Sequence, residues 1–176
     1  KEIFSHLELK NLKFKYKNSS ENIIDDINLK INKNNLIGIT GESGIGKSSL
    51  IGIITGLLKQ INGDYNLYNE QNEIIQKKNL ISYLGQEPII IDGTIQDNIV
   101  LSENENDFDE KKILSAIKFA DLDRFIFKLP KKEKTLVGEK GITLSIGQKQ
   151  SLALARCYYA DKQIMILDEP SSALDE

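Results

Sequence analysis

The sequence predicts an α/β fold, and three features of it indicate this class. Residues 36–40 (LIGIT) have the apolar composition of a buried strand, and residues 48–58 place apolar side chains at helical spacing. A second apolar run, residues 164–167 (IMIL), is unbroken, as in a parallel strand that is buried on both faces. Ahead of these, residues 7–16 and 27–31 alternate apolar and polar side chains, which favours an antiparallel β-layer.

Length and composition are typical of one soluble globular domain. Of the 176 residues, 40% are hydrophobic and 28% are charged, which is enough to build a core under a polar surface. A net charge of −3 without a dominant basic stretch gives no electrostatic case for a nucleic-acid partner. The longest apolar run, residues 51–58, is too short to cross a bilayer. The single cysteine, Cys157, excludes an internal disulfide, and we expect it to pack in the core.

A glycine-rich loop, GESGIGKSS, lies between the first predicted strand and the first predicted helix. It fits the pattern G-x-x-x-x-G-K-[ST], in which glycines let the backbone turn its amides inward on an anion. The positive end of the following helix and the charge of Lys47 point to the same place. Ser48 is expected to offer its hydroxyl to Mg²⁺ between the β- and γ-phosphates. The residues assigned to the nucleotide are Gly41, Glu42, Ser43, Gly44, Ile45, Gly46, Lys47, Ser48 and Ser49.

Two acids, Asp168 and Glu169, follow the second apolar run directly. The carboxyl ends of buried strands are where open α/β sheets place their chemistry. Successive strand residues point to opposite sides, so one carboxylate can hold Mg²⁺ while the next faces an attacking water. The structural alternative is a cap for a following helix. Gln86, just beyond another short apolar strand at residues 80–84, is a further candidate ligand of metal or water.

Residues 92–129 have the character of a helical lobe inserted into the sheet domain. Asp109 is a predicted helix cap, and the polar segment 103–110 is predicted to be a solvated loop. Apolar side chains then keep helical spacing at Ile113, Ala116, Ile117 and Ala120. Further on, residues 144–148 (LSIGQ) precede another helix. Their serine and glycine form either a second anion site or an ordinary helix cap.

Taken in order, these motifs resemble those of the nucleotide-binding domain of ATP-binding cassette (ABC) transporters, over essentially the whole chain. The glycine-rich loop resembles Walker A, and residues 164–168 resemble the Walker B strand. LSIGQ resembles the family signature LSGGQ, and residues 172–175 (SALD) resemble the D-loop. Each motif is moderately specific, whereas their joint order and spacing are very specific.

The resemblance also implies roles for single residues. Gln86 matches the Q-loop glutamine, Glu169 matches the catalytic glutamate, and Tyr16 matches the aromatic residue that stacks on adenine. The implied catalytic residues are Glu169 as general base, with Lys47 and Gln86. The implied cofactors are ATP and Mg²⁺, the metal being held by Ser48, Gln86 and Asp168.

The family resemblance implies a two-lobed P-loop NTPase. A RecA-like core with an antiparallel β-layer would comprise residues 1–86 and 160–176, and the helical signature lobe would comprise residues 87–159. It also implies a head-to-tail dimer in which each ATP lies between one subunit's Walker A loop and the other's signature. In such a dimer Ser145, Gly147 and Gln148 act in trans on the γ-phosphate.

Two stretches resemble exporters in particular. Residues 135–141 (TLVGEKG) are similar to T-x-V-G-E-x-G, and residues 93–99 (GTIQDNI) are similar to G-T-I-x-x-N-I. In that group the domain usually follows six membrane helices on the same polypeptide. The resemblance therefore implies a domain that hydrolyses ATP to drive export. It would work at the cytoplasmic face of a membrane, and the fragment with this sequence would itself be soluble.

The sequence departs from the family pattern in two places. Ile146 occupies the first glycine of LSGGQ, and we expect function to survive because Gly147 remains. The sequence ends at Glu176, ahead of the position of the family's switch histidine, which implies a C-terminally truncated domain of impaired stability. Two alternatives stay open: a regulatory nucleotide-binding subunit that hydrolyses poorly, and a soluble ABC-type ATPase of DNA repair or translation.

Overall fold

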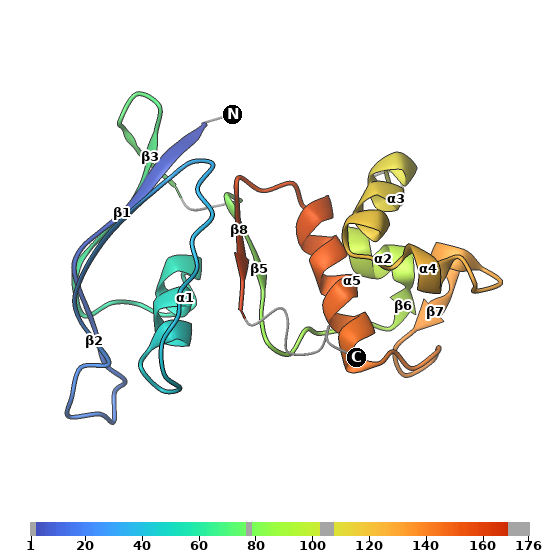
Figure 1. The fold of residues 1–176 in the computed structure, drawn as a ribbon, viewed down its shortest axis with the longest axis horizontal. Helices are drawn as coiled ribbons and strands as arrows, with labels where there is room; N and C mark the ends of the chain where they lie inside the picture. Colours follow the sequence, from blue (N-terminus) through green and yellow to red (C-terminus); the bar gives the residue numbers. More distant parts are fainter. Residues whose placement is uncertain (1–2, 77–78, 103–107, 169–176) are drawn as a thin grey trace. The chain divides into compact units, whose positions relative to one another are not determined.

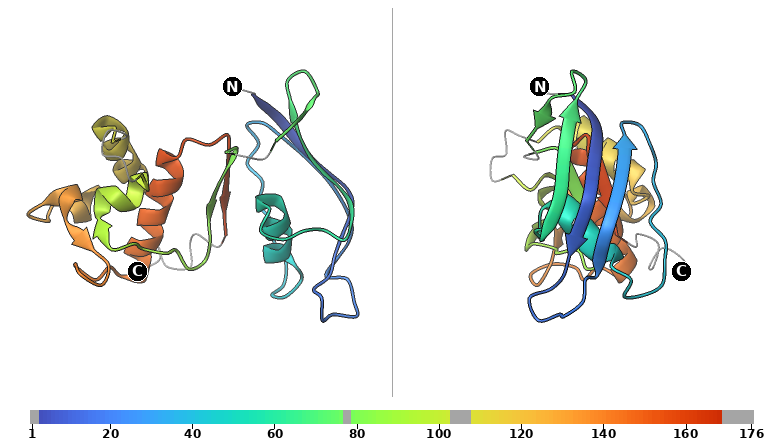
Figure 2. Two further views of the ribbon diagram at one scale, coloured as in Figure 1. Left: turned by 180° about the vertical axis from the view of Figure 1, so that it is seen from behind. Right: turned by 90° about the vertical axis from the view of Figure 1, so that its left-hand side faces the viewer.

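The computed structural model describes residues 3–76, 79–102 and 108–168. The chain divides into two compact units, residues 1–81 and 82–176, and each is described by itself. Figure 1 shows the elements of both units, and Figure 2 shows them from two further sides. Within the described ranges, no helix is both long enough and apolar enough to cross a membrane.

The first unit contains a four-stranded antiparallel sheet with the strand order β2-β1-β3-β4. Its strands are β1 (Phe4–Phe14), β2 (Ile24–Asn32), β3 (Asn62–Asn69) and β4 (Ile74–Ile75). This sheet is the antiparallel β-layer that the alternating pattern predicts. The register of β1 shifts between Leu9 and Leu12, so the alternating residues form one irregular strand. Gly63 lies in β3 with a φ of 84°, and a Cβ there would collide with the backbone of Lys10 and Asn11.

Helix α1 (Lys47–Thr55) covers one face of this sheet. The hydroxyl of Tyr65 on β3 donates to the carbonyl of Ile54 at 2.8 Å, which ties the sheet to the last turn of the helix. Gly56 ends the helix with a φ of 85° and donates its N–H to the carbonyl of Ile53. The helix is therefore shorter than the predicted 48–58, because glycine in the left-handed conformation stops it.

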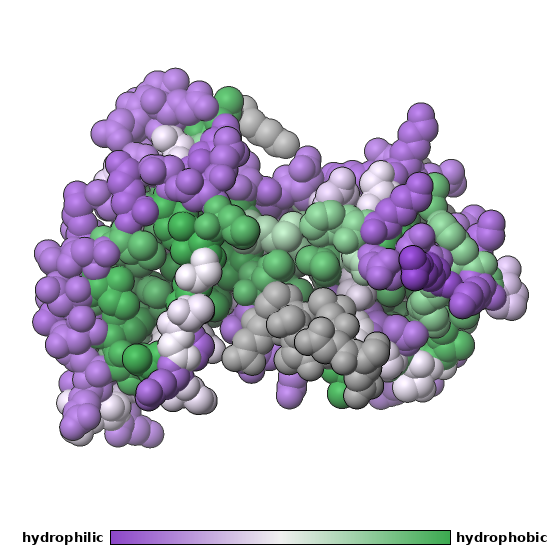
Figure 3. Space-filling view, viewed as in Figure 1, coloured by the Kyte–Doolittle hydropathy of each residue, from purple (hydrophilic) through white to green (hydrophobic). Residues whose placement is uncertain are grey.

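Residues 36–40 do not form the buried strand that their composition predicts. Leu36 is 98% exposed, Ile37 46% and Ile39 39%. Figure 3 shows hydrophobic residues over the part of this unit that carries α1 and the segment before it, and hydrophilic residues along the outer strands. A strand needs a neighbour to pair its backbone groups, and none of the described sheets includes residues 36–40. Apolar composition alone therefore overestimates the burial of this segment.

The second unit contains two small sheets and the helices. Strands β5 (Ile81–Leu84) and β8 (Ile164–Leu167) pair with each other, as do β6 (Gly93–Thr94) and β7 (Leu136–Val137). The predicted burial of residues 164–167 on both faces is wrong, since Met165 and Leu167 are each 38% exposed. The reason is that β8 belongs to a sheet of only two strands among the described residues.

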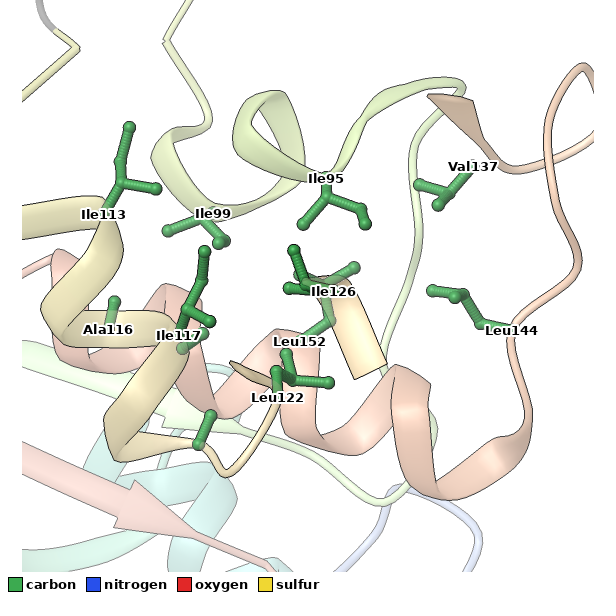
Figure 4. Packing of buried hydrophobic residues seen from close by; sticks show 12 residues of the cluster. Ile95, Ile99, Ile113, Ala116, Ile117, Leu122, Ile126, Val137, Leu144 and Leu152 are labelled. Carbon is green, nitrogen blue, oxygen red and sulfur yellow. The ribbon is translucent and has the colours of Figure 1, made fainter. Parts of the chain in front are cut away.

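Four α-helices and a short 3₁₀ helix are described in the second unit. They are α2 (Ile95–Val100), α3 (Glu110–Phe119), α4 (Asp123–Ile126), the 3₁₀ helix η2 (Lys132–Lys134) and α5 (Ile146–Tyr159). Asp109 caps α3 as predicted, because its carboxylate accepts from the N–H of Lys112 at 3.1 Å. Apolar side chains from α2, α3, α4 and α5 point toward one another and form a buried cluster (Figure 4). The helical spacing of residues 113–120 thus correctly predicts a core-facing helix.

Candidate functional site

The glycine-rich loop leads directly into helix α1, as its pattern requires. Gly44 and Gly46 have φ values of 83° and 107°, which side chains disfavour. At Gly46 a Cβ would lie 2.8 Å from Cγ2 of Ile23, too close for an ordinary contact. Glycine is therefore needed at position 46 both for its backbone conformation and for the close approach of the chain ahead of β2.

The start of α1 leaves its amides available for an anion. The N-cap residue, Gly46, has no side chain to accept from the first-turn N–H groups, and the first turn carries no acidic residue. Ser48, in that turn, is exposed. Free amides at the positive end of a helix attract phosphate or carboxylate. The geometry of this turn therefore fits an anionic ligand with an adjacent hydroxyl.

Lys47 folds back over the loop. Its Nζ donates to the carbonyl oxygens of Gly41 and Glu42, each at 2.9 Å. The ammonium is thus held beside the amides by two neutral acceptors, which an anionic oxygen can replace with a stronger charge-assisted bond. The side chain is in place to supply a full positive charge to a ligand on the loop.

Tyr16 belongs to the same unit and touches the same helix. Its hydroxyl lies 3.1 Å from Oγ of Ser49, which is buried, while 47% of the Tyr16 surface is exposed. The ring also packs edge-to-face with Phe14, at 5.0 Å between centroids. The first unit therefore brings together the predicted adenine platform and every predicted residue of the Walker A loop.

The second unit places Asp168 at the end of β8, beside β5. The N–H of Asp168 donates to the carbonyl of Leu84 at 2.9 Å, and Oγ of Ser82 donates to the carbonyl of Ile164 at 3.4 Å. These two bonds show that β5 and β8 run in the same direction. Gln86, two residues beyond β5, and Asp168 therefore follow the carboxyl ends of neighbouring strands.

Asp168 is a buried residue, with 7% of its surface exposed, and its carboxylate lies next to the hydroxyl of Tyr83. The Tyr83 hydroxyl donates to its Oδ2 at 3.4 Å. Burial, reinforced by the charge of Asp168, raises the pKa of Tyr83. The raised pKa favours the protonated Tyr83 hydroxyl, which is the form that donates to Asp168.

The signature-like segment forms a helix cap. Oγ of Ser145 accepts from the N–H of Gln148 at 3.2 Å, and Oε1 of Gln148 accepts from the N–H of Ser145 at 2.9 Å. This capping box uses the backbone N–H of Gln148. The backbone N–H groups of Ile146 and Gly147 remain at the start of α5 without a partner from the cap. Ile146 is 71% exposed. The cap that the sequence allowed is present, and its remaining amides are still suited to an anion.

The remaining predicted site residues are distributed as follows. Glu169 and the D-loop-like residues 172–175 lie outside the described residues. Tyr16 and residues 41–49 belong to one unit, whereas Gln86, Asp168 and residues 145–148 belong to the other. Among the described residues, no group of three His, Cys, Asp or Glu could hold a metal.

Sequence reasoning missed the role of Asn98 in the second unit. This residue is fully buried, and its amide exchanges bonds with the backbone N–H and carbonyl of Ile91 at 2.9 and 3.0 Å. Arg156 on α5 donates from Nε to the Asn98 carbonyl at 2.8 Å and from Nη2 to that of Ile89 at 3.1 Å. The pair ties residues 89–91, which follow Gln86, to α2 and α5. Two features of the sequence could have indicated this pair. Asn98 lies in the exporter-like stretch, and Arg156 is a charged residue among apolar residues of its helix.

A phosphate-type loop on a helix start, with an antiparallel sheet in the same unit, defines a P-loop nucleotide-binding protein. The chain belongs to the ABC transporter family, whose sequence profile, described as "ABC transporter", matches residues 24–172. This result confirms the family and the P-loop NTPase fold that the motifs predict, whereas the roles of single residues stay predictions.

Several similar proteins are named as exporters or multidrug resistance proteins. The chain is 39% identical over 173 residues to an export ATP-binding/permease protein of Rickettsia conorii, covering 96% of this chain and 30% of that protein. It is 34% identical over 173 residues to a multidrug resistance-like ATP-binding protein, MdlB, of Buchnera aphidicola, with 96% and 29% covered. The chain therefore spans about 30% of the length of such relatives.

A solved structure has the same fold. The structure of a bacterial Atm1-family ABC exporter with ATP bound matches with a TM-score of 0.84 at 25% sequence identity. The match covers 98% of this chain and 30% of the exporter chain.

Proposed function

We propose that this chain binds and hydrolyses ATP to power export across a membrane. The observation that carries the proposal is the loop of residues 41–48, with its left-handed glycines, open helix start and folded Lys47. The relatives named as export ATP-binding/permease proteins support export as the work that is driven. Nothing in the described structure favours a regulatory or soluble alternative.

The first unit supplies the binding half of this function. The loop amides and Lys47 bind the phosphates, with Lys47 exchanging the carbonyls of Gly41 and Glu42 for phosphate oxygens. The exposed ring of Tyr16 stacks on adenine. Residues 41–49 thus account for affinity toward the triphosphate, and Tyr16 accounts for affinity toward the base.

The proposal also includes Mg²⁺, which prefers oxygen ligands and usually takes only a few of them from the protein. The Ser48 hydroxyl is exposed at the helix start, and Asp168 and Gln86 offer carboxylate and amide oxygens at a sheet edge. When bound, the metal neutralises charge on the β- and γ-phosphates. Ser48, Gln86 and Asp168 are its proposed ligands.

Hydrolysis itself is assigned to Glu169. Its carboxylate accepts a proton from water as the water oxygen bonds to the γ-phosphorus, and the bond from that phosphorus to the β–γ bridging oxygen breaks. Gln86 orients the same water, and Lys47 stabilises the negative charge that spreads over the transferred group.

A second nucleotide-binding domain completes the site in this proposal. Two such domains pair head to tail, and Ser145, Gly147 and Gln148 of one approach the γ-phosphate held by the other. The support is the exposed start of α5, where the amides of Ile146 and Gly147 remain after the cap is made.

The partner that receives the energy is a set of transmembrane domains, N-terminal on the same natural chain. The relatives support this, since they are named as permeases and extend well beyond the matched part. The domain then works at the cytoplasmic face of the membrane, with residues 1–86 and 160–176 as core and β-layer and residues 87–159 as helical lobe. No nucleic acid takes part.

Replacing the proposed base tests the proposal. The Glu169→Gln variant of the complete protein should keep ATP affinity and form an ATP-dependent dimer, while its turnover falls by two or more orders of magnitude, as roughly expected for a lost general base. Glu133→Gln, in helix η2, which has no buried residue, is the matched control and should hydrolyse ATP at the wild-type rate. Wild-type turnover in Glu169→Gln would remove the assigned role of Glu169.

A further inference from the structure

Residues 85–91, the segment that carries Gln86, are held in place by side chains of the helices. In the part of the chain that the structure describes, no backbone-to-backbone hydrogen bond involves this segment. Its carbonyl and N–H groups bond instead to the side chains of Gln150, Arg156 and Asn98. Because β5 ends at Leu84, the path of the chain beyond it depends on these side chains.

Gln150 on α5 is the anchor that bonds to Gln86 itself. It is 4% exposed, and its Nε2 donates to the carbonyl of Gln86 at 3.4 Å. Ala153 and Cys157 of the same helix form a buried cluster with Leu84, which holds α5 against the end of β5. The side chain of Gln150 therefore reaches the main chain of Gln86 from a helix that is itself packed on the preceding strand.

Stability alone does not explain an amide at position 150. Its Oε1 is buried and has no hydrogen-bond partner among the described residues. Asn98, the other buried amide that bonds to this segment, has partners on both its oxygen and its nitrogen. A buried polar atom without a partner lowers stability, so an apolar side chain of similar size would suit the core better. The bond from Nε2 to the Gln86 carbonyl is therefore the feature that requires glutamine here.

We propose that Gln150 is a positioning residue that fixes the main chain of Gln86 and thereby the direction of its side chain. This inference rests on the proposed function, in which the exposed Gln86 side chain serves the metal and the attacking water. A side chain that leaves a fixed main chain is already oriented, so less of it has to be ordered in the transition state. Loss of the Gln150 bond should therefore slow turnover and leave ATP binding unchanged, because residues 41–48 bind the phosphates.

A double-mutant cycle on the complete protein tests this proposal. Turnover of ATP with magnesium is measured for wild type, Gln150→Leu, Gln86→Ala and the double variant. Leucine can stay buried at position 150 but cannot donate to the Gln86 carbonyl. Gln150→Leu should lower kcat by about 2- to 10-fold, the usual contribution of one hydrogen bond, and change the KM for ATP by less than about 2-fold. The double variant should be no slower than Gln86→Ala, because Gln150 acts through Gln86.

Calorimetric ATP affinity without magnesium separates this role from a role in folding, and it should change by less than about 2-fold in Gln150→Leu. The control is Ser151→Ala, which alters the next buried polar residue of α5 and should turn over ATP as wild type does. An unchanged kcat in Gln150→Leu, losses that add in the double variant, or an equal loss of metal-free affinity would each overturn the proposal. Gln150→Met makes the same test if Gln150→Leu folds poorly. A wild type that does not hydrolyse ATP would instead contradict the proposed function.

Discussion

At the scale of single residues, Gly46 links backbone conformation to ligand binding. It adopts a φ of 107°, caps α1 without a side chain, and lies against Ile23. Any side chain would strain the backbone, collide with Ile23 and displace the amides that face the anion. The glycine pattern in the sequence predicted the first of these demands. The contact with Ile23 joins segments far apart in the chain, and only the structure shows it.

Gly46→Ala should therefore weaken ATP binding by about tenfold or more, since a left-handed non-glycine residue alone costs about 1–2 kcal/mol. Calorimetric titration of the complete protein with ATP measures the effect. Gly56→Ala is the matched control, because Gly56 has a similar φ of 85° but a Cβ there meets nothing within 4 Å. Gly56→Ala should lower stability and leave ATP affinity intact. Equal affinities for both variants would contradict the role assigned to Gly46.

At the scale of elements, features set by nearby residues were predictable, whereas burial that depends on distant strands was not. The Walker A turn, the cap at Asp109 and the apolar face of α3 depend on residues within a few positions of each other, and the structure contains them. Burial of residues 36–40 and 164–167 depends on neighbouring strands far away in sequence. Both segments are apolar enough to be central strands, yet both are substantially exposed. Apolar composition therefore correctly predicted a strand at residues 164–167, but it wrongly predicted burial for both segments.

The join between α2 and α5 could not have been predicted from periodicity either. Asn98 has the polar side chain least expected inside a core, and it is buried because backbone groups of Ile91 and Thr94 satisfy its amide. Arg156 then bonds to the Asn98 carbonyl. Because its hydrogen bonds are satisfied, the Asn98 side chain holds residues 89–91, which follow Gln86, against α2 and α5.

Asn98→Ala should lower the free energy of unfolding by about 3 kcal/mol, because it removes four side-chain hydrogen bonds, two of them to the backbone of Ile91. Urea denaturation of the complete protein measures the loss. Gln96→Ala, a change of the same kind in the same helix, should cost less than about 0.5 kcal/mol. A loss in Asn98→Ala no larger than in Gln96→Ala would show that the amide is not a structural tie.

At the scale of the whole molecule, the proposed function requires residues of two units and of two subunits to act on one nucleotide. In the proposed dimer, Lys47 of one subunit and Ser145 of another serve the same ATP. The start of α5 has the chemistry for this, with an exposed serine and two remaining amides. The resemblance to the family implied this role for Ser145, and the role stays a prediction.

Mixing two inactive variants tests that pairing. Lys47→Ala removes the phosphate-binding charge, and Ser145→Lys breaks the cap of α5 and adds bulk at its start. Neither should hydrolyse ATP alone, but a mixed dimer contains one site with both an intact loop and an intact signature. Turnover should therefore reappear on mixing and grow with protein concentration. If mixed samples stay inactive while both variants still associate, the signature does not act in trans between copies of this chain.

The most direct measurement is an experimental structure of the complete protein with ATP and magnesium bound. The account predicts that Lys47 Nζ leaves the carbonyls of Gly41 and Glu42 for phosphate oxygens, with the amides of residues 44–48 around the β-phosphate. Adenine should lie on Tyr16, whose hydroxyl still bonds to Ser49. Finding Lys47 bonded to the two carbonyls as before, with the triphosphate held elsewhere, would contradict the account.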